Sequence, residues 1–276
     1  MALIYKLIRK IKAVNIKRIE RYRSRKKPMP TGDGFIYRGP STQFSDTWEQ
    51  NERTFLRKIF ERYDIFLNVG AHYGYYCCMA RKAGLEVIAI EPLIANFKML
   101  LNNLLLNDLH SECTLINAAA GQRPHVSFIS GAFSTASMLN SYQHDKLLTQ
   151  AVPIITIDTL AVDPKHDLLI LMDVEGFEYE ALLGASNLLK RSSRVDWIIE
   201  VFPFIPTKNT KTQENKNFLK LFEIMFDNGY QAWLISDKLT IITRDTIELE
   251  AKKNYLDRMH GNFFFSRKEL LITPSS

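Results

Sequence analysis

Two glycines and a glutamate have the spacing expected of a nucleoside-binding site. Gly70 and Gly74 follow the apolar run FLNV, and Glu91 ends the next apolar run, EVIAIEP. Glycines let a chain turn sharply at the end of a strand. An acidic residue about 20 positions later can accept hydrogen bonds from both hydroxyls of a ribose. The pattern therefore predicts a ligand that contains adenosine.

The same glycines lack the features that bind a phosphate chain. They form neither the GxGxxG pattern of dinucleotide sites nor the lysine-containing pattern of a P-loop. A nucleoside without a pyrophosphate is therefore favoured, and S-adenosylmethionine fits that description. Close packing of a helix on a strand is the alternative reason for two glycines four residues apart.

Asp173 is the first candidate for a general base. It follows the apolar run LLILM, so we expect it at the edge of the sheet where ligands bind. A partly apolar setting would raise the pKa of its carboxyl group. The alternative role is an N-cap for a helix that starts near Phe177.

Four further residues are expected near the same edge. Glu175 and Glu178 could bind substrate hydroxyls or a divalent ion, or could be solvated acids in the first turn of a helix. His72 lies inside the glycine turn and could act as a base or donate to the substrate. Glu200 ends the next strand and is a candidate for substrate binding. Because no histidine joins the acidic cluster in the sequence, we predict no metal site.

From residue 64 onward, strands alternate with helices, which predicts a mostly parallel sheet covered on both faces. We expect the folded domain to span residues 31–276 with a core at 64–266. A helix is expected over 46–63, capped by Asp46. The Ser/Thr-rich stretch 130–145 is expected to be either a lid or a disordered loop.

Residues 1–27 contain eleven Lys/Arg residues and one acid, a net charge of +10, which leaves −4 of the total of +6 for the rest. Apolar residues recur there at helical spacing, so residues 1–30 are predicted to form a basic amphipathic arm. Contact with an anionic membrane, packing on the domain, nucleic-acid binding and organellar targeting are all open.

No apolar stretch reaches 18 residues, so we predict no membrane-spanning helix. The three cysteines form no disulfide framework, which favours the cytoplasm.

The sequence resembles the FkbM family of S-adenosylmethionine-dependent methyltransferases. The motifs that carry the resemblance are FLNVGAHYGYY, VIAIEP, LLNNLLLN, INAAAG, TIDTL, LILMDVEGFEYEALLGA and IIEV, in this order. The resemblance implies a class I Rossmann-like fold with a seven-stranded sheet. It also implies methyl transfer to a hydroxyl oxygen, often on a sugar of a glycan, a glycolipid or a secondary metabolite.

The resemblance also implies roles for residues. The positions that match the family's cofactor site are Asn68, Gly70, Ala71, Gly74, Glu91, Pro92 and Ala119. Asp173, Glu175 and Glu178 match its acidic motif. Asn68 stands where the family commonly has aspartate, so a charged partner for the cofactor's ammonium group is lost and weaker binding is expected.

Two other functions stay open at this level. The basic arm suggests a methyltransferase acting on nucleic acid, although the acidic body argues against it. Asn68 suggests a non-catalytic binding protein derived from the family.

Overall fold

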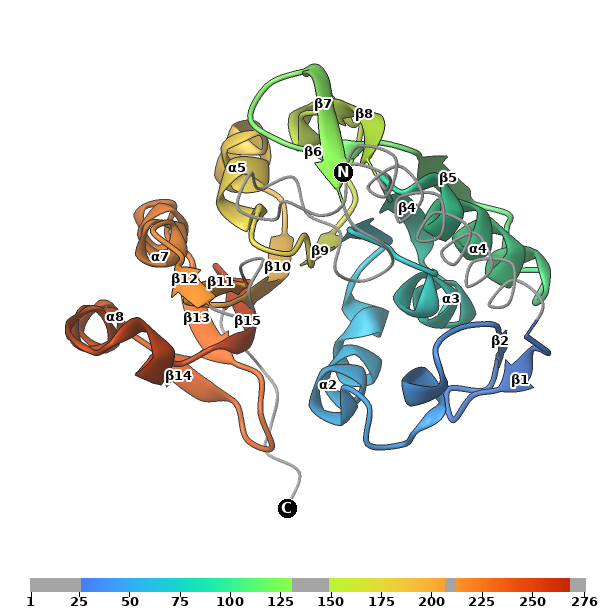
Figure 1. The fold of residues 1–276 in the computed structure, drawn as a ribbon, viewed down its shortest axis with the longest axis horizontal. Helices are drawn as coiled ribbons and strands as arrows, with labels where there is room; N and C mark the ends of the chain where they lie inside the picture. Colours follow the sequence, from blue (N-terminus) through green and yellow to red (C-terminus); the bar gives the residue numbers. More distant parts are fainter. Residues whose placement is uncertain (1–25, 131–148, 207–211, 269–276) are drawn as a thin grey trace, which may run out of the picture.

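The computed structural model describes residues 26–130, 149–206 and 212–268 (Figure 1). The predicted helix in the basic arm and nearly all of the Ser/Thr-rich stretch 130–145 lie outside these residues. Both stay predictions.

The main sheet is built from eight strands of the described chain, in the order β14-β13-β15-β10-β9-β3-β4-β5. The strands are β3 (Ile65–Val69), β4 (Glu86–Ile90), β5 (Cys113–Ile116), β9 (Leu168–Met172), β10 (Val195–Val201), β13 (Gln231–Leu234), β14 (Thr240–Ile242) and β15 (Gly261–Ser266). The five strands from β5 to β10 are mutually parallel, and β15 runs antiparallel to β10. This is the Rossmann-like class I methyltransferase fold that the sequence predicts.

The strand count differs from the expected seven. Thr240–Ile242 forms the extra edge strand, β14, which pairs antiparallel with β13. Two of its three residues are exposed, so it lacks the apolar run by which a buried strand is recognised in a sequence.

The order of the strands reverses beside β3. The chain passes from β3 through β4 to β5 on one side, and later adds β9 and β10 on the other. In open parallel sheets, ligands bind at the carboxyl ends of the strands where this reversal occurs. The ends of β3 and β9 are therefore the expected place for a site.

Helices cover both faces of the sheet (Figure 1). The first face carries α2 (Gln50–Ile59), α3 (Tyr75–Lys82) and α4 (Ile94–Leu105). The second carries α5 (Glu178–Leu183), α6 (Ser186–Lys190), α7 (Phe218–Asp227) and α8 (Arg244–Lys252). Side chains of a strand alternate between the faces. In β9, Leu168, Ile170 and Met172 pack toward the second face, whereas Leu169 and Leu171 pack toward the first.

A separate three-stranded sheet departs from the sequence prediction, which placed these strands in the main sheet. It contains β6 (Ala119–Ala120), β7 (His125–Ser130) and β8 (Thr149–Ile155), in the order β6-β8-β7. Asn117 turns the chain out of the main sheet, because its side-chain amide donates to the carbonyls of Glu91 (2.8 Å) and Pro92 (3.0 Å). The apolar run CTLINAAAG (113–121) predicts one strand, but the structure divides it into β5 and β6.

The remaining short elements lie around this core. They are the strand pairs β1 (Met29–Pro30) with β2 (Ile36–Tyr37) and β11 (Phe204–Pro206) with β12 (Thr212–Glu214), and the 3-10 turns η1 (Ser41–Phe44), η2 (Phe60–Arg62), η5 (Ile157–Thr159) and η6 (Tyr255–Asp257). None of the helices in the described parts of the chain is both long and apolar enough to cross a bilayer.

The helix expected over 46–63 starts later than predicted, and Asp46 does not cap it. Helix α2 begins at Gln50, after Glu49 in a left-handed conformation with φ of 42°. The Arg53 guanidinium donates to the carbonyls of Ser45 (3.3 Å) and Trp48 (3.2 Å). These bonds hold the preceding residues in a turn, so Trp48 and Glu49 lie outside the helix.

The sequence EYEALLGASNLLKRS (178–192) predicts one helix, but the structure divides it into α5 and α6. The break falls at Gly184, where the chain passes so close to Gly121 that a Cβ atom would lie 2.1 Å from the Gly121 carbonyl oxygen. The Gly184 carbonyl accepts a hydrogen bond from the Asp158 amide instead of continuing the helix.

Substituting glycine at two turns separates backbone strain from steric overlap. Gly70 and Gly84 both have left-handed φ values, 88° and 93°, but a Cβ atom at Gly70 would lie 1.8 Å from the Asp173 carbonyl oxygen, whereas Gly84 has open space. Gly84→Ala should cost about 1–2 kcal/mol of unfolding free energy from strain alone. Gly70→Ala should cost about 2–5 kcal/mol because overlap is added. Urea denaturation measures both, and equal losses would contradict the close approach.

Candidate active site

A cavity of about 430 Å³ opens where β3, β4 and β9 end. Most residues that the sequence singled out line it: Asn68, Gly70, Ala71, His72, Glu91, Pro92, Ala119, Asp173, Glu175 and Glu200. The structure thus brings together side chains from five separate segments of the chain.

The turn after β3 forms one side of the cavity. The amides of Gly70 and Ala71 donate to the Ile90 carbonyl at 2.9 and 3.0 Å, which fastens the turn to β4. His72 adopts a left-handed conformation with φ of 49°. Its ring stacks on Tyr73, with centroids 4.2 Å apart.

Glu91 is fixed beside this turn. Its carboxylate accepts hydrogen bonds from the amides of His72 (2.8 Å) and Leu93 (2.9 Å) and from the Asn96 side chain (3.2 Å). Burial raises the pKa of Glu91 to about 7, although these hydrogen bonds oppose the shift. A carboxylate has about four lone-pair sites, so acceptor capacity remains for a ligand in the cavity.

Asn68 is a buried residue at the base of the cavity. Its side-chain amide donates to the Cys77 sulfur at 3.4 Å, and the side chain brings no charge to the end of β3. Pro92 and Ala119 also line the cavity and present apolar surface beside Glu91. These residues could hold a flat, uncharged group such as a nucleobase.

Gly74 and Glu178 are not among the residues that line the cavity, although the sequence assigned them to the site. Gly74 allows α3 to pack on α4, because a Cβ atom there would lie 2.2 Å from the Leu100 side chain. Glu178 is buried, and its carboxylate accepts from the Gly176 amide at 2.8 Å. Both residues shape turns that support the site.

Asp173 faces the cavity and is hydrogen-bonded to Glu200. Asp173 is exposed to solvent, but the protein atoms packed around its carboxyl group still raise its pKa. Burial, and then repulsion by Asp173, raise the pKa of Glu200 further. Two carboxyl groups in contact cannot both ionise easily, so the pair retains one proton. Asp173 does not cap α5, which begins at Glu178 without a side-chain cap.

Glu175 adds a third carboxyl group to this side. Burial and then the neighbouring Asp173 raise its pKa to about 8. A cavity rich in carboxyl groups near neutral pKa suits proton transfer and the binding of hydroxyl or cationic groups.

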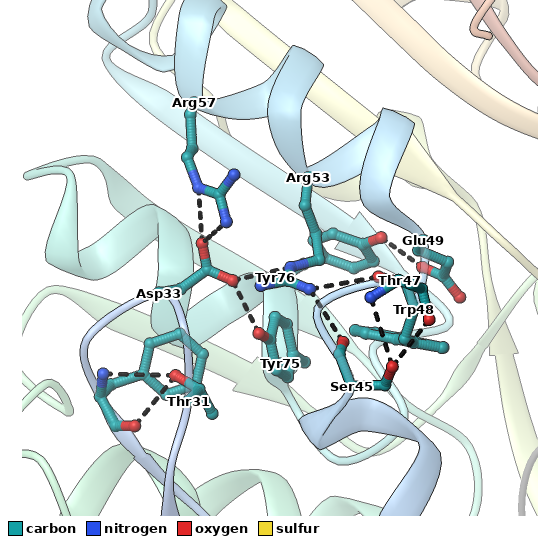
Figure 2. Close-up of polar contacts among 11 residues, drawn as sticks. Thr31, Asp33, Ser45, Thr47, Trp48, Glu49, Arg53, Arg57, Tyr75 and Tyr76 are labelled. Atoms are coloured by element: carbon teal, nitrogen blue, oxygen red, sulfur yellow. Dashed lines mark hydrogen bonds and ion pairs between the residues drawn. The ribbon is translucent and has the colours of Figure 1, made fainter. Parts of the chain in front are cut away.

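A wall built by the segment before and within α2 was missed by the sequence analysis. Trp48, Glu49 and Glu52 line the cavity together with Tyr76 of α3, and Figure 2 shows the Tyr76 hydroxyl donating to the Glu49 carboxylate. Burial raises the pKa of Glu49 to about 7. The expected helix over 46–63 concealed this role, because it placed these residues in a helix packed on the sheet.

In the described residues, no group of three or more His, Cys, Asp or Glu side chains has the arrangement of a metal site.

Comparisons with known proteins identify the family. The family model for the methyltransferase FkbM domain matches residues 68–232, more than half of the chain. No curated protein matches the sequence significantly.

Among solved structures, methyltransferase FkbM from Methylobacillus flagellatus KT is 17% identical, with a TM-score of 0.48 over 74% of this chain and 43% of that one. This chain thus spans less than half the length of that protein. A SAM-dependent methyltransferase from Agrobacterium tumefaciens is 10% identical, with a TM-score of 0.44 over 88% and 70% of the two chains. TYW2 from P. horikoshii, in complex with MeSAdo, is 14% identical, with a TM-score of 0.45 over 88% and 72%.

The family match agrees with the fold and with the cofactor, S-adenosylmethionine, that the sequence predicts. The cavity contains a glycine turn, an acid at the end of the second strand, and carboxyl groups at the end of the fourth parallel strand in chain order. The chain therefore belongs to the methyltransferase FkbM domain family.

Proposed function

We propose that this methyltransferase acts on a hydroxyl oxygen of a sugar, in a glycan, a glycolipid or a secondary metabolite. The observation that carries the proposal is the Asp173–Glu200 carboxyl pair, which faces the same cavity as Glu91 and the glycine turn. This juxtaposition brings a proton acceptor to the cavity that would hold the methyl donor.

On the cofactor side, Glu91 would accept hydrogen bonds from the ribose hydroxyls. Its existing bonds to the amides of His72 and Leu93 hold the carboxylate in place before a ligand binds. Gly70 and Ala71 would leave room for the ligand beside the turn, and Pro92 and Ala119 would contact the adenine. Asn68 would accept a hydrogen bond from the amino-acid part without neutralising its charge.

When bound, S-adenosylmethionine supplies a methyl group made electrophilic by its sulfonium. The residues of the chain have two tasks: to hold the acceptor oxygen in line and to remove its proton. Asp173 would accept that proton. Glu200 would hold its own proton and donate a hydrogen bond to Asp173, which keeps the latter oriented and ionised. His72, in the glycine turn, is a second candidate for donating to or accepting from the acceptor.

Glu175 and Glu200 would also accept hydrogen bonds from further hydroxyl groups of the acceptor. Glu178, which does not line the cavity, would support this side through its bond to the turn at Gly176. Because the lining carboxyl groups would repel phosphates, nucleic acid is not the expected acceptor.

Replacing Glu91 tests the cofactor site. Glu91→Ala should weaken S-adenosylmethionine binding by at least about tenfold, because the ribose loses a charge-assisted acceptor. Glu91→Gln should lose less. Calorimetry measures both, and Glu86→Ala, at the exposed start of the same strand, is the control. Unchanged affinity in Glu91→Ala, with an unchanged melting temperature, would remove the assignment.

Replacing the paired carboxyl groups tests the proton acceptor. Asp173→Asn should reduce methyl transfer by roughly 10²–10⁴-fold. Glu200→Gln should stay much more active than Glu200→Ala, because an amide can donate to Asp173 as a protonated glutamate does. The measurement is mass spectrometry of native glycans in a gene-deleted strain that carries each variant, where restored activity adds the mass of a methyl group. Full activity of Asp173→Asn would exclude it as the base.

We also propose that residues 1–27 contact an anionic membrane surface from the cytoplasmic side. The support is their net charge of +10 and the helical spacing of their apolar residues. Deleting residues 1–25 should abolish sedimentation with phosphatidylserine vesicles and leave S-adenosylmethionine affinity unchanged. Vesicle binding that survives the deletion would contradict this role.

A further inference from the structure

The wall that contains Glu49 has a different origin from the rest of the cavity. Trp48, Glu49 and Glu52 come from the segment 40–56, whereas the family match covers residues 68–232, which include Tyr76 of the same wall. The glycine turn, Glu91, Asp173 and Glu200 all lie within the matched region. The segment 40–56 thus lies outside the matched region, and its side chains can select the acceptor without altering that region.

The lining of the cavity is unbalanced in charge. Six carboxyl residues line it: Glu49, Glu52, Glu91, Asp173, Glu175 and Glu200. The lining, as far as the chain is described, includes no lysine or arginine. A cavity of this kind attracts a cation and repels an anion.

The arginines of α2 are engaged elsewhere. Arg53 Nε donates to Asp33 Oδ2 at 2.8 Å, and Arg57 Nε donates to Asp33 Oδ1 at 2.6 Å. Figure 2 shows both guanidinium groups directed at Asp33, where the Tyr75 hydroxyl also donates. Attraction by Arg53 opposes the effect of burial on the pKa of Glu49 but is smaller than it. Both arginines of this helix are thus bound to Asp33 and are not among the residues that line the cavity.

The cofactor accounts for only part of this negative charge. S-adenosylmethionine carries one net positive charge, and Glu91 is assigned to its ribose. Glu49 and Glu52 remain on a wall that also contains two aromatic rings, Trp48 and Tyr76, with centroids 6.0 Å apart. Aromatic faces combined with carboxylates are the usual protein environment for an ammonium group. Burial raises the pKa of Glu49 to about 7, and an ammonium group beside its carboxylate would favour the charged form.

We propose that the acceptor carries a protonated amine in addition to its hydroxyl group, as an amino sugar does, and that Glu49, with Glu52 and Trp48, binds the amine. This inference rests on the proposed function, because it concerns the acceptor of that same cavity. It makes Glu49 a specificity-determining residue: the amine held on this wall directs the hydroxyl toward Asp173.

The test compares two sugars that differ in one charge. The full chain is loaded with S-adenosylhomocysteine and titrated in a calorimeter with glucosamine, whose amine is protonated, and with N-acetylglucosamine, whose nitrogen is neutral. Glucosamine should bind at least about tenfold more tightly, the effect of one partly buried charge pair. Equal affinities, tighter binding of N-acetylglucosamine, or no heat from glucosamine would overturn the proposal.

Variants show whether Glu49 is responsible. Glu49→Gln should remove the preference for glucosamine while the affinity for S-adenosylhomocysteine stays unchanged. Glu61→Gln, the same change on an exposed position just after α2, should keep the preference. Tyr76→Phe removes the hydrogen bond to Glu49 but leaves its charge, so it should also keep the preference. A preference that survives in Glu49→Gln would exclude this residue.

The outcome is separable from that of the proposed function. If S-adenosylhomocysteine itself fails to bind, the cofactor assignment fails, and the two sugars can still be compared on the unloaded chain. If it binds and the sugars do not differ, only the amine proposal fails.

Discussion

The site depends on the close approach of two strand ends. At Gly70 the backbone passes the Asp173 carbonyl so closely that a methyl group would overlap it, and the Asp173 amide donates to the Val69 carbonyl at 3.0 Å. This contact joins the end of β3 to the end of β9 at the point where the strand order reverses. Glu91 accepts a hydrogen bond from the His72 amide of the same turn. The residue proposed to bind the cofactor and the residue proposed to remove the proton, Asp173, therefore share one cavity.

The carboxyl groups that line the cavity lower the stability of the fold, and the contacts around the cavity offset part of this loss. Desolvated carboxyl groups that repel one another oppose folding once they ionise. Next to them, Arg53, Arg57 and Tyr75 converge on the buried Asp33 and tie the N-terminal segment to α2 and α3 (Figure 2). Breaking one partner from a buried ion pair is strongly destabilising, so this network can hold the wall in place without placing a cation in the cavity.

The strands and the residues at their ends could be predicted from the sequence, because each is marked by a short continuous pattern of residues. Apolar runs that end in Gly70, Glu91 or Asp173 revealed both the strands and the cavity edge, because buried parallel strands are continuous in sequence and their ends meet at one edge. For Gly74 the glycine spacing does not show whether a ligand or Leu100 is the close neighbour, and the structure places Leu100 there. The role of Glu49 was not predictable, since the contacts of Arg53 that keep it out of the helix come from the folded structure.

The proposed division of the cavity separates methyl transfer from the choice of the acceptor. In the proposed mechanism, the strand ends supply what methyl transfer to a hydroxyl group needs: residues that hold the donor and a group that removes a proton. Neither task depends on what else the acceptor carries. The wall at residues 40–56 touches the cavity without forming part of the sheet, so its side chains can change without disturbing the contact between Gly70 and Asp173. In this chain that wall is acidic and aromatic, and the chemistry of the acceptor should follow from it.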